Sequence, residues 1–203
     1  MAKAKFDPSA LPNWMEESLG VPLTALFNTF KNDDDWTFVI KIHAIIEAAL
    51  NQILITQMGN PSLDRIIEKL ETNNRRTGKI AFIRAYDLLP DKACLFIRLL
   101  SEIRNDAVHD ARNFGLNLND YARGLSKENR ANWKAALTYP FVGVIDVEAV
   151  DRSGEEYIGR LRDGISFGCV HLLVRALNHH REASKRLIKE LVASELNQST
   201  PKE

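Results

Sequence analysis

The segment from Ser101 to Asp110, which reads SEIRNDAVHD, gathers side chains suited to acid–base chemistry beside a bound anion. Histidine is the side chain that most often serves as a general acid or base, so His109 could give or take a proton during a reaction. Arg104 stays charged, and its guanidinium matches two oxygens of a phosphate group. Asn105 could hold a phosphate oxygen or orient the imidazole. These types indicate proton transfer at an anionic substrate.

Helical geometry keeps a structural interpretation open for the same segment. The apolar face of the predicted helix comprises Phe96, Leu99, Leu100, Ile103 and Ala107. The opposite face comprises Arg98, Glu102, Asn105 and His109, within about 60° of one another, which is also the pattern of a solvent-exposed face. Arg104 and His109 diverge by about 140° around the axis, so helical position alone does not place them in one site.

A second polar pair, His43 and Glu47, lies in the most apolar segment of the chain. The two residues are four positions apart and therefore share one face of a helix. A buried imidazole and carboxylate must satisfy each other or a third group. A structural pair is favoured over a catalytic one, although a buried glutamate that faces another motif could orient it.

The elements that must position these residues are predicted to be helices almost throughout, because the hydrophobic period is helical and Gly and Pro fall at the boundaries. The predicted helices cover residues 12–30, 35–57, 61–71, 79–89, 90–110, 119–138 and 165–196. Residues 139–164 are predicted as strand or irregular structure. Asp33 to Asp35 are N-cap candidates for the helix that follows them. The fold class is therefore predicted as all-α, with a helical extension over residues 1–34 and one helical domain over 35–203.

The predicted helix over residues 35–57 is apolar on both sides, since Ile40, Ala44, Ala48 and Ile55 lie opposite the face of Phe38 and Ile42. A helix that is apolar all round should be buried all round. We therefore expect either the central helix of a bundle or a helix that also packs on a second subunit.

Composition excludes several classes of protein. The 203 residues are 45% hydrophobic and 27% charged, with a net charge of zero, so no global attraction to nucleic acid is expected. Every long apolar segment is interrupted by charge and the N-terminus lacks an apolar signal region, so we expect a cytoplasmic protein without membrane contact. Cys94 and Cys169 are predicted to be buried thiols, and neither a metal site nor a cofactor is predicted.

The motif RNDAVH, Arg104 to His109, resembles the R-x4-H signature of the HEPN superfamily, the higher eukaryotes and prokaryotes nucleotide-binding domains. The order of the segments AIIEAALNQIL, RRTGKIAFIRAYDLLPDK and RLLSEIRNDAVHD is similar to that of the mannitol operon repressor branch. The resemblance covers about residues 36–115. It implies a HEPN-like helical bundle with additional N- and C-terminal helices.

The resemblance also implies a function, that of a metal-independent endoribonuclease acting as a toxin or defence effector. Such an enzyme cleaves RNA at a dimer cleft to 2′,3′-cyclic phosphate and 5′-OH ends. The residues that match its catalytic motif are Arg104, Asn105 and His109, with His43, Glu47, Glu102 and Asp106 in support. In a homodimer, the arginine of one subunit and the histidine of the other can meet in a shared cleft. A partner antitoxin or regulatory protein is also implied.

The predicted contacts to the RNA backbone are cationic side chains around the motif, where residues 73–112 hold eight Lys/Arg against five Asp/Glu. They are Arg75, Arg76, Lys79, Arg84, Arg98 and Arg112. The alternative is a non-catalytic regulatory or interaction module of the mannitol operon repressor type, favoured by the zero net charge and by the acids Glu102, Asp106 and Asp110. A DNA-binding repressor is not favoured, because no helix carries the basic face that groove reading requires.

Overall fold

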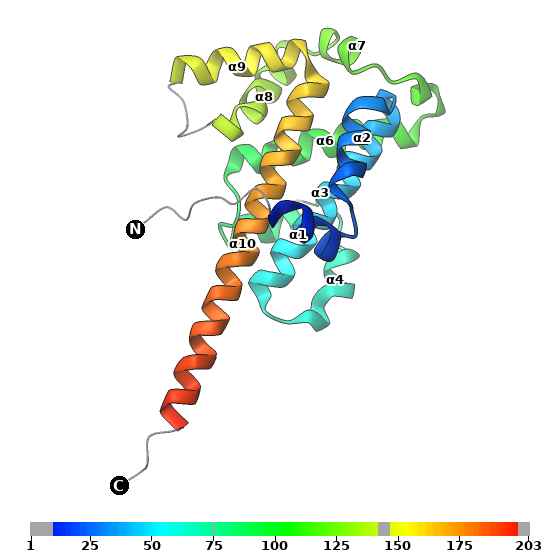
Figure 1. The fold of residues 1–203 in the computed structure, drawn as a ribbon. Helices are drawn as coiled ribbons and strands as arrows, with labels where there is room; N and C mark the ends of the chain where they lie inside the picture. The colour runs from blue at the N-terminus through cyan, green and yellow to red at the C-terminus, as the bar shows by residue number, and fades with distance from the viewer. Residues whose placement is uncertain (1–9, 75, 142–146, 199–203) are drawn as a thin grey trace.

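The computed structural model describes residues 10–74, 76–141 and 147–198, and these residues form helices without a strand (Figure 1), which confirms the all-α prediction. The longer helices are α1 (Ala10–Leu19), α2 (Leu23–Asn32), α3 (Asp35–Met58), α6 (Asp91–His109), α8 (Lys127–Leu137), α9 (Val147–Gly159) and α10 (Leu161–Gln198). Shorter helices are α4 (Asp64–Glu68), α5 (Lys79–Ala85) and α7 (Leu118–Arg123), with 3-10 turns η1 (Pro61–Leu63), η2 (Ala111–Gly115) and η3 (Tyr139–Phe141).

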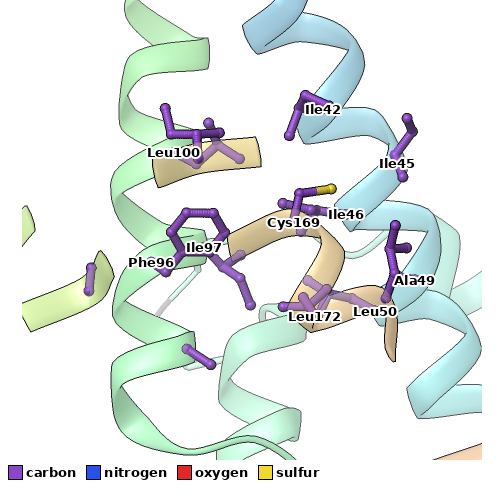
Figure 2. Packing of buried hydrophobic residues seen from close by; sticks show 14 of the residues in the cluster. Ile42, Ile45, Ile46, Ala49, Leu50, Phe96, Ile97, Leu100, Cys169 and Leu172 are labelled. Carbon is purple, nitrogen blue, oxygen red and sulfur yellow. The ribbon is translucent and has the colours of Figure 1, made fainter. Parts of the chain in front are cut away.

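Helix α3 lies at the centre of the bundle and packs against α6 and α10. Figure 2 shows Ile46 of α3, Leu100 of α6 and Leu172 of α10 in the same core, with the buried thiol Cys169 beside them. The second apolar side of α3 is more open than predicted, since Ala44 is exposed and its neighbours on that side are half-buried. By length and composition α3 could cross a membrane, but more than half of its most apolar stretch is buried, as in the core helix of a soluble protein.

Three consecutive acids at the start of α3 have three different partners. Asp34 caps the helix by accepting a hydrogen bond from the Thr37 backbone N–H at 2.9 Å. Asp33 pairs with Lys41, whereas Asp35 accepts from the Leu118 backbone N–H at 2.7 Å. The predicted run of N-cap candidates therefore contains one cap, one ion pair to a residue of the same helix and one contact to a distant segment.

The described part of the N-terminal region, residues 10–34, belongs to the same hydrophobic core as α3. The helix predicted over residues 12–30 is in fact two helices, because the chain turns at Gly20, whose φ is +65°, and continues through Pro22. Trp14 and Met15 of α1 and Leu26 of α2 are buried against the central helix. These residues therefore pack as part of the bundle.

Residues 139–164 were predicted as strand or irregular structure, and residues 142–146 of this stretch lie outside the described part. The prediction is wrong for the described residues, which form η3, α9 and the start of α10. Gly154 lies inside α9 and not in a turn. A Cβ at Gly154 would lie 2.7 Å from Thr138 Cγ2, and one at Gly168 would lie 2.8 Å from Phe96 Cζ. These glycines permit close helix packing instead of turns.

The helix predicted over residues 119–138 is also divided, because α7 ends at Arg123, before Gly124, and Ser126 caps α8 by accepting from the Asn129 N–H. Helix α10 begins four residues earlier than predicted, at Leu161, and its C-terminal half extends away from the other helices (Figure 1).

Candidate functional site

The C-terminal half of α6 forms one wall of a pocket of about 460 Å3, and α3 forms another. Arg104, Asn105 and His109 line it from α6, together with His43 and Glu47 from α3. The remaining wall is residues 71–74, which precede α5, with Ser101 of α6 near the α3 side. Five residues selected from the sequence thus line one pocket.

Arg104 and His109 line this pocket in a single chain, despite their divergence around the helix. Between them on the α6 surface lie Ser101 and Asn105, which also line the pocket, so the cavity spans a broad face of the helix. The long arginine side chain reaches this face from one edge and the histidine from the other. The expectation that a second subunit is needed to bring the two groups near one another is therefore not required by the geometry.

Asn105 holds the guanidinium of its neighbour. Arg104 Nη1 donates a hydrogen bond to Asn105 Oδ1 at 3.0 Å. Arg104 is half-buried, whereas Asn105 and His109 are exposed. The pocket therefore presents an oriented cation beside a solvent-accessible imidazole, a combination that can bind an anion and transfer a proton to or from it.

His43 is buried in the pocket wall and bound to α6. Its Nε2 atom lies 3.0 Å from Ser101 Oγ, and that hydroxyl donates its one hydrogen to Ile97 O at 2.8 Å. Nε2 of His43 is thus the donor to Ser101, which assigns the tautomer. Burial lowers the pKa of His43 against the opposing effect of Glu47, and the positive charges of Arg104 and Lys79 lower it further.

Glu47 is held by two donors that reach it from the segment after α4. Glu47 Oε1 accepts from Thr72 Oγ1 at 2.7 Å and from Lys79 Nζ at 2.8 Å. Burial alone would raise the pKa of Glu47, but the hydrogen bonds from Lys79 and Thr72 outweigh it, and the pKa lies below its usual value. The requirement that His43 and Glu47 find polar partners is therefore met by third groups: Ser101 for the histidine, Thr72 and Lys79 for the glutamate.

The prediction of Lys79 as a contact to the RNA backbone is wrong, because its side chain is completely buried. The ammonium pairs with Glu47 and donates to Glu68 O at 3.4 Å. The lysine follows Gly78 at the start of α5 and points into the bundle, which the polar sequence around it did not indicate.

The other cationic residues predicted to contact the RNA backbone lie in different environments. Arg98 pairs with Glu102 at 2.6 Å, and Arg84 pairs with Asp91 at 3.3 Å; both arginines line a second pocket. Arg76 is exposed. Arg75 and the side chain of Arg112 lie outside the described part of the structure.

Two acids predicted as supporting residues lie outside the first pocket. Glu102 is engaged with Arg98 on the exposed side of α6. Asp106 lines a separate cavity near η2, where its backbone oxygen accepts from Asn113. His109 lines both this cavity and the first pocket, and thus lies between them.

Sequence reasoning missed five lining residues: Glu71, Thr72, Asn73, Asn74 and Ser101. The first four form the polar run ETNN between two apolar helices, and that run was the available signal. Ser101 is a small hydroxyl residue beside the apolar face of α6, where a hydroxyl must find a partner.

Comparisons with protein-family models, with curated proteins and with solved structures found no match to this chain. Among residues 10–74, 76–141 and 147–198, no three His, Cys, Asp or Glu side chains are grouped so that they could hold a metal ion.

Proposed function

We propose that the chain is a cytoplasmic, metal-independent endoribonuclease of HEPN type. The observation that supports this proposal is the grouping of Arg104, Asn105 and His109 in one pocket, with His43 and Glu47 in its wall. A lone R-x4-H motif is short, but the pocket joins it to a buried polar network on the neighbouring helix.

In the proposed reaction one bond to phosphorus forms, another breaks, and two protons are transferred. The ribose 2′-oxygen attacks the adjacent phosphorus and loses its proton, while the bond from phosphorus to the 5′-oxygen breaks. That 5′-oxygen leaves with the bonding electrons and takes up a proton. The products are a 2′,3′-cyclic phosphate and a 5′-OH end, and no oxidant or metal is consumed.

In this proposal His109 accepts the proton of the 2′-OH, and water protonates the departing 5′-oxygen. Arg104 binds two phosphate oxygens and stabilises the charge that develops on them, while Asn105 fixes the guanidinium. His43 does not add a second charge near Arg104, because its lowered pKa keeps it neutral. Glu47 and Lys79 hold the pocket wall in place.

The proposed assembly is a homodimer whose pockets lie near the subunit contact, and the proposed role is that of a toxin or defence effector. A protein partner such as an antitoxin would then control it by covering the pocket.

A second candidate function is a non-catalytic regulatory module of the mannitol operon repressor type. It is favoured by the carboxylate of Glu71, which lines the same pocket as Arg104 and weakens its attraction for an anion. In that case the pocket binds a partner or ligand without cleaving it.

The test is cleavage of mixed RNA in EDTA by the wild type, by His109→Ala and by His180→Ala as a matched histidine control. Light scattering first establishes that the three proteins share one oligomeric state. We expect the wild type and His180→Ala to produce cyclic-phosphate ends, and His109→Ala to be slower by roughly 100-fold or more. Equal rates in all three proteins, or no cleavage by the wild type, would contradict the proposal.

A further inference from the structure

A second and larger pocket, of about 1010 Å3, lies beside the first between α5, α6 and α8. Its polar lining includes Arg84 of α5, Arg98 of α6, and Glu128, Asn129 and Asn132 of α8. Neither the motif nor the proposed cleavage reaction uses this pocket. Its volume is in the range of sites for small organic ligands.

The two pockets share part of their lining. Asn73 and Asn74 line both cavities, so the two pockets adjoin at these residues. Asn73 is anchored at this point, since its Nδ2 donates to Arg98 O at 3.3 Å. Its Oδ1 is buried without a hydrogen-bond partner in the described part of the protein. A buried carbonyl oxygen without a donor is uncommon in folded proteins.

The lining chemistry resembles that needed to recognise a nucleotide. Asparagine side chains donate and accept together and can match the edge of a base, and arginine binds phosphate oxygens. Arg98 and Arg84 are paired with Glu102 and Asp91 in exposed ion pairs. Such pairs contribute little free energy, so each arginine can exchange its carboxylate for a phosphate at small cost.

We infer that this second pocket binds the nucleotide next to the scissile phosphate in single-stranded RNA, and this inference rests on the proposed endoribonuclease function. Asn129 and Asn132 contact the base edge, while Arg98 and Arg84 hold the phosphate that follows. A base inside a duplex cannot enter a cavity of this kind, so the site selects unpaired RNA. The pocket then sets which nucleotide flanks the cleavage site.

The test uses the whole chain with His109→Ala, which slows cleavage by roughly 100-fold in the proposed mechanism, and fluorescein-labelled homopolymers of A, C and U. Anisotropy titrations in EDTA measure affinity for each homopolymer at several salt concentrations. We expect Asn132→Ala in this background to weaken binding of the preferred homopolymer by roughly tenfold and to reduce the differences among the three. We expect Arg98→Ala to lower the slope of log affinity against log salt by about 0.7, the value for one lost phosphate contact on a single strand.

Matched controls lie outside the pocket. Asn119→Ala removes an exposed asparagine, and Arg123→Ala removes an exposed arginine that is paired with Asp120 as Arg98 is with Glu102. Neither control should change affinity or salt slope. Thermal unfolding of each variant confirms that it is folded before titration.

The outcomes separate this inference from the proposed function. Suppose that wild-type cleavage depends on His109 but that Asn132→Ala and Arg98→Ala leave RNA binding unchanged. That result overturns the second binding site and leaves the nuclease proposal standing. If the wild type does not cleave RNA and the His109→Ala chain does not bind it, both the proposed function and this inference are overturned.

Discussion

The ammonium of Lys79 lies 2.8 Å from the Glu47 carboxylate, and the lysine side chain is completely buried. This contact joins the first residue of α5 to the middle of α3 beneath the first pocket. Thr72 donates to the same carboxylate oxygen, so the segment that precedes α5 is held at the pocket wall by side-chain hydrogen bonds as well as by its backbone. This wall of the pocket is therefore positioned by an ion pair whose lysine is completely buried.

Glu47→Gln should destabilise the fold by roughly 3 kcal/mol, because it leaves the buried ammonium of Lys79 without its counter-charge. Lys79→Met should cost less, since the glutamate is about one-third exposed and keeps its bond from Thr72. The double variant Glu47→Gln/Lys79→Met should be more stable than Glu47→Gln alone. Urea unfolding of the four proteins measures these differences, and a double variant less stable than both single variants would contradict this account.

The stability of the protein should fall as the pH drops below about 6.5, in part because of His43. The pKa of His43 in the folded chain lies below its usual value of 6.5, so the unfolded chain binds the proton more strongly. The contribution of His43 is therefore fully present above pH 6.5 and is lost as the pH falls toward the lowered pKa. One group accounts for at most about 1.4 kcal/mol per pH unit.

His43→Gln provides the comparison, because the glutamine amide can donate to Ser101 but does not titrate. Urea unfolding at several pH values between 5 and 8 should give a shallower decline below pH 6.5 for this variant than for the wild type. Parallel curves for the two proteins would show that His43 is not the group responsible.

Helical periodicity predicted the elements that form the core, because α3 and α6 carry strong apolar faces that other helices must cover. It did not predict α9, which lies in the stretch predicted as strand or irregular structure, and where Gly154 allows close approach to Thr138 of the preceding segment. A single sequence does not distinguish a glycine that permits a turn from one that permits contact. The difference depends on which helix lies opposite.

The candidate site was predictable in its residue types but not in its geometry. The R-x4-H spacing selected Arg104 and His109, and the helical period selected His43 with Glu47, but joining the two pairs requires the packing of α3 against α6. Lys79 shows most clearly that the sequence did not predict the geometry of the site. Its charge indicated an exposed residue, and its burial depends on a glutamate 32 positions earlier in the chain.

Arg104→Lys should lower the rate of RNA cleavage more than Asn105→Ala. Lysine keeps the charge but loses the planar fork that binds two phosphate oxygens, so we expect a loss of roughly 100-fold. Asn105→Ala removes one hydrogen bond that orients the guanidinium, and a loss of about fivefold is expected. Single-turnover rates on one labelled RNA measure both effects. A larger loss for Asn105→Ala would indicate that the amide contacts the substrate directly.

Arg162→Lys should destabilise the bundle by about 2–3 kcal/mol, because this arginine binds the turn between α2 and α3 from the start of α10. Its guanidinium donates to Asp35 Oδ1 at 2.6 Å, to Thr29 O at 2.9 Å and to Asp33 O at 2.8 Å, and it lies 4.3 Å from the ring centre of Phe38. A lysine ammonium has three donors on one atom and cannot reach these separated acceptors together.

Arg160→Lys is the matched control for this substitution, since Arg160 is exposed and its ion pairs with Glu156 and Asp163 lie on the surface. Exposed pairs of this kind contribute little, so the control should change the free energy of unfolding by less than about 0.5 kcal/mol. Urea unfolding of both variants gives the comparison. Equal stability of Arg162→Lys and Arg160→Lys would mean that the turn is held by the apolar contacts of α2 and α3 instead of by the guanidinium.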